Sequence, residues 1–192
     1  IYKGLSVDFS LKYLNDAAIS VGERYDHNYQ QQLYDQVATA LHDAGWQISS
    51  VDFQPIVKGS DSLVIAGRFQ ISDDDIRPAG NLAVGSPLVS YLLDNLFGQV
   101  RERDYCRNVS IRLEESVRIK LSPHLLVDIA EYHDLWFRDS LEFSDEFSFD
   151  DGSVLFRRVF DFAGGMISAD DYNNFRDYIL SARNQRYVQI SQ

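Results

Sequence analysis

The chain has 192 residues, of which 45% are hydrophobic and 24% are charged, the composition of an ordinary folded protein. Its net charge of −11, from 29 acidic and 18 basic residues, argues against a nucleic-acid partner, because binding phosphates needs concentrated Lys and Arg. No apolar run reaches the roughly 18 residues that a transmembrane helix requires, and the single cysteine permits no internal disulfide.

The beginning of the chain predicts a strand and then a helix. Apolar and polar residues alternate without a break from Leu5 to Tyr13, which is typical of a strand that is buried on one side. Apolar residues then recur every three to four positions, and this spacing predicts a helix over residues 28–44. Asp26 or Asn28 can cap its first turn, because a short polar side chain accepts a hydrogen bond from the backbone N–H groups there.

A hairpin and a second helix follow. An irregular strand over residues 46–56 is expected to pair with an alternating strand over residues 63–71. Ser86 and Pro87 then mark the start of a helix over residues 86–97, since Ser is a common cap and Pro fits the first helical position.

The second half of the chain is rich in predicted strands. Alternating apolar residues with turn residues between them predict strands at residues 109–113, 117–121, 125–129, 134–143, 153–162 and 187–190. Asp150-Asp151-Gly152 predicts a tight hairpin turn, in which Gly152 takes the left-handed conformation. A helix over residues 168–183 follows, with Ser168 as its cap.

These elements predict an α+β fold, a largely antiparallel β-sheet with about three helices packed on one face. One domain over residues 1–192 accounts for the pattern. The polar segment at residues 101–104 leaves a second arrangement open. In that arrangement a lobe of residues 1–100, with a strand, a helix, a hairpin and a helix, precedes a lobe of residues 105–192, with antiparallel strands and the terminal helix.

The end of the chain also resembles a known family. A strand carrying Arg157-Arg158 is followed by a turn and helix that read Gly-x-Ile-Ser-x-x-Asp-Tyr-x-x-Phe-Arg and run from Gly165 to Arg176. This string resembles the last segment of a family of bacterial transglutaminase-like proteins. In that family an N-terminal β-rich domain of unknown function precedes a papain-like transglutaminase core.

The resemblance implies a context for the chain. It implies that residues 1–192 are a C-terminal accessory region whose partner is the remainder of its own polypeptide, in a bacterial periplasmic or extracytoplasmic location. The family's catalytic core is expected upstream, since the chain starts at Ile1 without a Met or a leader. No cofactor follows from the resemblance.

No pattern in the sequence predicts catalysis. A transglutaminase-like reaction needs a thiolate, a histidine base and a carboxylate or amide that orients the base. The single cysteine, Cys106, lies at the start of a predicted strand beside Arg107, and a structural role explains it better than a role as nucleophile. We therefore predict that the chain is not an enzyme.

Metal sites are not predicted either. The histidines are His27, His42, His124 and His133, and none has the spacing of zinc ligands. A site built from His124, His133 and Asp134 is conceivable, but solvated loop positions explain these residues better. Asp73-Asp74-Asp75 lacks the Gly and the closing Glu of a calcium loop.

Aromatic residues supply the candidate binding surface. The chain has 11 Tyr, 12 Phe and 2 Trp, and they are dense around Tyr132, Trp136, Phe137 and Phe143. On a β-surface such side chains stack on sugars or hold an extended peptide, although burial in a core is their commoner use. The first hypothesis is a non-catalytic accessory or interaction domain of a larger transglutaminase-like cysteine peptidase or transferase. The second is an autonomous peptide- or glycan-binding module.

Overall fold

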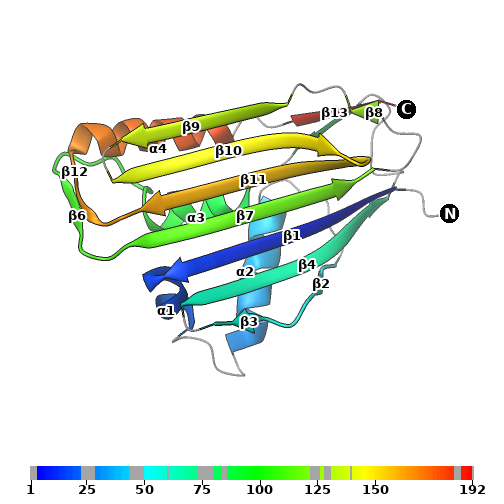
Figure 1. The fold of residues 1–192 in the computed structure, drawn as a ribbon, viewed down its shortest axis with the longest axis horizontal. Coiled ribbons are helices and arrows are strands. Elements are labelled where there is room, and N and C mark those ends of the chain that lie inside the picture. The colour runs from blue at the N-terminus through cyan, green and yellow to red at the C-terminus, as the bar shows by residue number, and fades with distance from the viewer. Residues whose placement is uncertain are drawn as a thin grey trace.

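A computed structural model describes residues 4–22, 29–43, 50–59, 61–72, 80–83, 86–121, 126–127, 131–138, 140–183 and 187–191. Its main feature is one eight-stranded antiparallel sheet (Figure 1). The strands are β1 (Gly4–Asn15), β2 (Asp52–Phe53), β3 (Val57–Lys58), β4 (Ser62–Ser72), β7 (Ile111–Lys120), β9 (Tyr132–Arg138), β10 (Leu141–Asp150) and β11 (Ser153–Phe162). Neighbouring strands follow the order β2-β4-β1-β7-β11-β10-β9, and β3 pairs with β4. The strands before residue 100 and those after residue 105 therefore share one sheet, because β1 pairs with β7.

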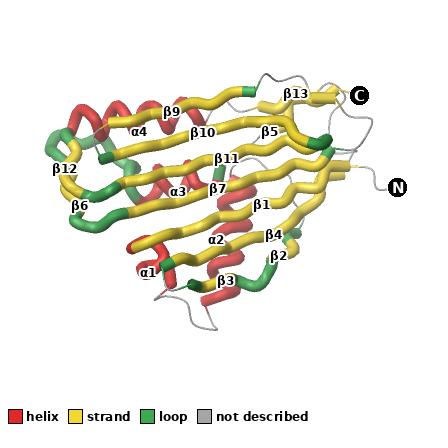
Figure 2. The backbone as a smooth tube through the Cα atoms, in the orientation of Figure 1, coloured by secondary structure: helices red, strands yellow, loops and turns green. Residues whose placement is uncertain are grey.

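Two smaller sheets accompany the large one. The first pairs β6 (Tyr105–Arg107) with β12 (Gly165–Ile167), and the second has the order β5 (Gly80–Ala83), β13 (Tyr187–Ser191) and β8 (Leu126–Val127). Figure 2 shows β6 and β12 at one end of the large sheet and β13 near the other.

All four described helices pack on the same face of the large sheet. They are α1 (Asp16–Gly22), α2 (Tyr29–Asp43), α3 (Pro87–Asn95) and α4 (Ala169–Arg183). The face they cover holds two apolar clusters. Val37 and Leu41 of α2 complete the first, and α3 and α4 complete the second around Phe160 and Phe175. We call this covered side the inner face and the opposite side the open face.

The predicted α+β fold is confirmed, and the helices lie close to their predicted bounds. Both predicted helix caps within the described residues are present: Val89 N donates to Ser86 Oγ at 3.0 Å, and Asp171 N donates to Ser168 Oγ at 3.1 Å. The short helix α1 and the strands β5, β6 and β12 were not predicted. Asp26 and Asn28 lie outside the described residues.

Predicted strand boundaries are wrong in three places. Residues 46–56 were expected as one irregular strand, but within the described residues 50–59 only Asp52–Phe53 and Val57–Lys58 are strands. Residues 109–113 and 117–121 were expected as separate strands, but β7 runs continuously from Ile111 to Lys120. Residues 134–143 were expected as one strand, but β9 ends at Arg138 and β10 begins at Leu141. The physical reason is the alternation of side chains: even-numbered residues of β9 and odd-numbered residues of β10 point inward, so a turn must separate the two strands.

The hairpin between β10 and β11 has a two-residue loop. The strands pair up to Asp150 and Ser153, and the loop residues Asp151 and Gly152 have φ of 44° and 68°. Two positive φ values are typical of a type I′ turn. The predicted left-handed conformation of Gly152 is confirmed, and Asp151 shares it.

Replacing Gly152 by Val should lower the free energy of unfolding by about 1–3 kcal/mol, because a β-branched residue is strained at positive φ. A Cβ at this position would meet no other atom within 4 Å, so the loss would report backbone strain alone. Asp151→Val should also destabilise, whereas Asp150→Val should not, since Asp150 lies in β10. Urea denaturation of the three variants measures this. Equal stability of the Gly152 and Asp150 variants would contradict it.

Truncating Phe175 tests whether α4 is integral to the core. The ring is fully buried, and its centroid lies 4.7 Å from that of Trp136 and 4.8 Å from that of Phe97. Phe175→Ala should cost about 3–5 kcal/mol of unfolding free energy, because the deletion leaves a cavity. The exposed neighbour Asn174 provides the control, and Asn174→Ala should change stability by less than about 0.5 kcal/mol. Chemical denaturation followed by circular dichroism measures the unfolding free energy of both variants. Similar losses of stability in the two variants would show that α4 is not integral to the core.

Candidate interaction surface

The open face of the large sheet is lined with charged side chains. Residues that pair across neighbouring strands lie on the same face, so the strand registers place them in rows. The described charged residues in these rows are Lys12, Arg68, Arg112, Arg118, Lys120 and Arg157, with Asp8, Asp52, Glu114, Glu142, Glu146 and Asp161. Six of these residues are basic and six are acidic.

Part of the open face is neutralised by ion pairs between strands. Arg112 Nη1 lies 2.7 Å from Asp161 Oδ2, and Arg112 Nε lies 3.0 Å from Glu114 Oε1. These hydrogen bonds raise the pKa of the Arg112 guanidinium, that to Asp161 contributing most. Arg68 pairs with Asp8 in the same way. Exposed pairs of this kind add little stability, but they leave few charges available to a partner.

Three other cations on this face form a second group, which we call the cationic cluster. Arg118 and Lys120 belong to β7, and Arg157 belongs to β11. Arg157 lies opposite Ser116, so it is a diagonal neighbour of Arg118, at about 7–8 Å between backbones. All three side chains are exposed, and within the described part of the chain none makes an ion pair or a side-chain hydrogen bond. The cluster can therefore accept carboxylates of a partner.

A row of buried charges crosses the inner face beneath this surface. Arg158 of β11 lies opposite Glu115 of β7 and Asp145 of β10. Its Nη1 donates to Glu115 Oε2 at 3.0 Å, and its Nε lies 3.2 Å from Asp145 Oδ1. The three side chains are at most 2% exposed. Burial lowers the pKa of Arg158, but the attraction of Glu115 and Asp145 outweighs burial, so the pKa rises overall.

Hydrogen bonds join this buried row to the elements around it. Ser86 Oγ donates to Glu115 Oε2 and Leu88 N donates to Glu115 Oε1, which ties the first turn of α3 to the sheet. Tyr132 Oη of β9 donates to Asp145 Oδ1 at 3.3 Å. The pKa of the Tyr13 hydroxyl is raised, mainly because the side chain is buried, and also because Tyr91 and Glu115 lie nearby. Ion pairs and hydrogen bonds within the core therefore hold the row together.

Sequence reasoning missed these residues, although alternation could have found them. In β7 the odd-numbered residues point inward, and Glu115 occupies one of these positions, between Leu113 and Val117. In β11 the inward positions are even-numbered, so Arg158 points inward while Arg157 points to the open face. A charged residue at an inward-facing position of an alternating strand therefore indicates an ion pair in the core.

The four aromatic residues proposed as a binding surface do not share an exposed face. Phe143 is fully buried, and Tyr132 and Trp136 are half-buried against the inner clusters. Phe137 alone lies on the open face, with 61% of its surface exposed. Alternation explains the split, because Trp136 and Phe137 are consecutive residues of β9.

The candidate nucleophile and metal ligands lie apart. Cys106 is exposed, and its Sγ lies 3.7 Å from Asn108 Oδ1. His42 lies on α2 and His133 on the open side of β9. His27, His124 and Asp73–Asp75 fall outside the described residues. Among the residues that are described, no three His, Cys, Asp or Glu side chains gather to hold a metal ion.

An open hollow of about 660 Å³ lies where the chain leaves α3, lined by residues 94–96, 98–103 and Tyr172. The guanidinium of Arg101 lies over the rings of Tyr105 and Tyr172, at 4.6 and 5.1 Å from their centroids. The side chain of Asn173 holds the backbone N–H and carbonyl of Arg101 at 3.0 and 2.8 Å. These contacts fasten the segment to α4.

Comparison with known proteins adds no relative, since no family model, curated protein or solved structure matches the chain. Within the described ranges, no helix is both long and apolar enough to span a membrane.

Arg158→Met should destabilise the protein by about 3–5 kcal/mol, because it leaves Glu115 and Asp145 buried without their cation. Arg157→Met is a matched control in the same strand, and it should change stability by less than about 0.5 kcal/mol because Arg157 is exposed. Urea unfolding of both variants, of Glu115→Gln and of Arg158→Met/Glu115→Gln measures the coupling between Arg158 and Glu115. Equal losses in the two single variants would show that the row does not support the core.

Proposed function

We propose that this chain is a non-catalytic accessory domain that docks on a transglutaminase-like cysteine peptidase or transferase core. The open sheet face contacts the core through its cationic cluster. The observation that carries the proposal is that Arg118, Lys120 and Arg157 are exposed, make no ion pair with any described residue, and lie on a face that no described helix covers. We infer the identity of the partner from the resemblance of the end of the chain to that family.

The position of the cluster supports a docking role. Its residues lie on β7 and β11, which each have a neighbouring strand on both sides, so the backbone beneath the cations is rigid. Arginine suits such a surface, because its guanidinium binds carboxylates in two-point geometry. The partner surface would therefore be acidic, and long-range attraction would speed its association.

In this proposal the chain contributes binding and orientation, and the core contributes the thiol chemistry. Such chemistry requires a histidine base, and among the described residues the contact of the exposed Cys106 Sγ is the amide oxygen of Asn108, not a histidine. A peptide- or glycan-binding module with an aromatic surface is less well supported, because three of the four aromatic residues concerned face the helices.

The test measures the affinity of this chain for a separately produced transglutaminase-like core by isothermal titration calorimetry. Arg118→Glu/Lys120→Glu should weaken binding by at least about tenfold, and binding should weaken as salt rises. Arg103→Glu/Arg101→Glu, the same charge change in the segment after α3, should have a much smaller effect. Equal effects of both pairs, or no binding to the core, would refute the proposal.

A further inference from the structure

The two edges of the large sheet differ in how they are protected. At one edge, β4 is followed only by β2 and β3, which have two residues each and are separated by a segment containing Pro55. Short strands and proline are common ways to block further pairing, since proline has no N–H to donate. At the other edge lies β9, which has seven residues and no proline, and no described strand pairs with its outer side.

The β9 edge is also apolar and firmly held. Leu135 and Phe137 are 53% and 61% exposed on the open face. On the inner side, the ring centroids of Trp136 and Phe175 are 4.7 Å apart, and Tyr178 Oη of α4 donates to Asp134 Oδ2 at 2.7 Å. The outer edge of β9 can pair with a new strand, because β9 is already held in an extended conformation. Pairing therefore costs little further conformational entropy.

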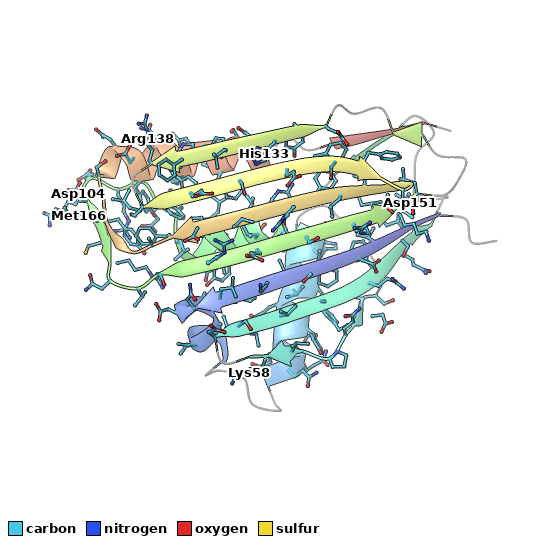
Figure 3. The ribbon with its side chains drawn as sticks, in the orientation of Figure 1. Lys58, Asp104, His133, Arg138, Asp151 and Met166 are labelled. Atoms are coloured by element: carbon cyan, nitrogen blue, oxygen red, sulfur yellow. The ribbon has the colours of Figure 1, made fainter. Side chains whose placement is uncertain are left out.

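We propose that β9 pairs antiparallel with β9 of a second copy of this chain, which gives a symmetric dimer with one continuous sheet. A register centred on Trp136 makes the strand complementary to itself. Leu135 then lies opposite Phe137 of the second copy on the open face, and Asp134 lies opposite Arg138 of the second copy on the inner face. Each pair occurs twice because of the symmetry. Figure 3 shows Arg138 and His133 on β9 at the upper edge of the sheet.

Charge complementarity favours this register over those centred on Asp134 and Leu135. A register centred on Asp134 would place two Asp134 carboxylates opposite each other, which is unfavourable. A register centred on Leu135 would place His133 opposite Phe137 and would separate Asp134 from Arg138. Arg138 is exposed, and within the described residues it makes no ion pair or side-chain hydrogen bond, so it is available to Asp134 of the second copy.

The proposal does not depend on the docking role of the cationic cluster, because β7 and β11 lie inside the sheet and not at its edge. The dimer uses backbone pairing at β9, whereas docking uses side chains on the open face. Arg118→Glu/Lys120→Glu should therefore leave the dimer intact, so the failure of either proposal can be recognised separately.

Oligomeric state is the first test. Light scattering coupled to size-exclusion chromatography should show a concentration-dependent dimer. Leu135→Lys should raise its dissociation constant at least about tenfold, because it places two lysines at the apolar contact. Val57→Lys, on the opposite edge and 64% exposed, should leave the constant unchanged. A chain that stays monomeric at every concentration, or equal effects of the two variants, would overturn the proposal.

Cysteine cross-linking tests the register in chains that also carry Cys106→Ser. Leu135→Cys mixed with Phe137→Cys should form a disulfide-linked pair under mild oxidation, because directly opposite residues lie within the reach of a disulfide. Each variant alone should cross-link poorly, since its two copies would be offset along the strand. Efficient cross-linking of Leu135→Cys with itself would overturn the register. Cross-linking no stronger than that of a Val57→Cys control would overturn the dimer.

Discussion

The buried ion pairs of Arg158 constrain the whole arrangement. A guanidinium within the core is tolerated only where carboxylates compensate its charge, and Glu115 and Asp145 do so from the two neighbouring strands. The same network reaches Ser86 at the start of α3 and Tyr132 in β9. A single set of polar contacts between the two apolar clusters therefore links β7, β11, β10 and β9 to the start of α3.

The two faces of the sheet have different roles because side chains alternate between the two faces along every long strand. Arg157 and Arg158 are consecutive residues with identical side chains, yet one is exposed and the other is buried. A register shift of one residue in β11 would exchange the two faces of the strand and bring Arg158 to the open face. The inner charges thus hold the outer charges in place, and the cationic cluster keeps its geometry as a result.

Local patterns in the sequence predicted local features. The strand starting near Leu5, the cap at Ser86 and the hairpin at Gly152 follow from alternation, capping and turn chemistry, each of which involves few neighbouring residues. The sequence did not predict which strands are neighbours, because β1 lies between β4 and β7 and no local signal encodes that order. The open face and the β9 edge both depend on this order. Glu115 was misread as a break, since its compensating Arg158 is distant in the sequence.

The central place of β1 also has a consequence for how the chain folds. Phe9 lies opposite Val117, so the pairing of β1 with β7 must close a loop of about a hundred residues. Contacts this far apart in sequence slow folding, and the chain should fold in milliseconds to seconds rather than microseconds. During synthesis at about 5–20 residues per second, β1 can pair with β4 but must wait several seconds before β7 exists. For that interval the apolar side of a half-built sheet needs protection from other chains.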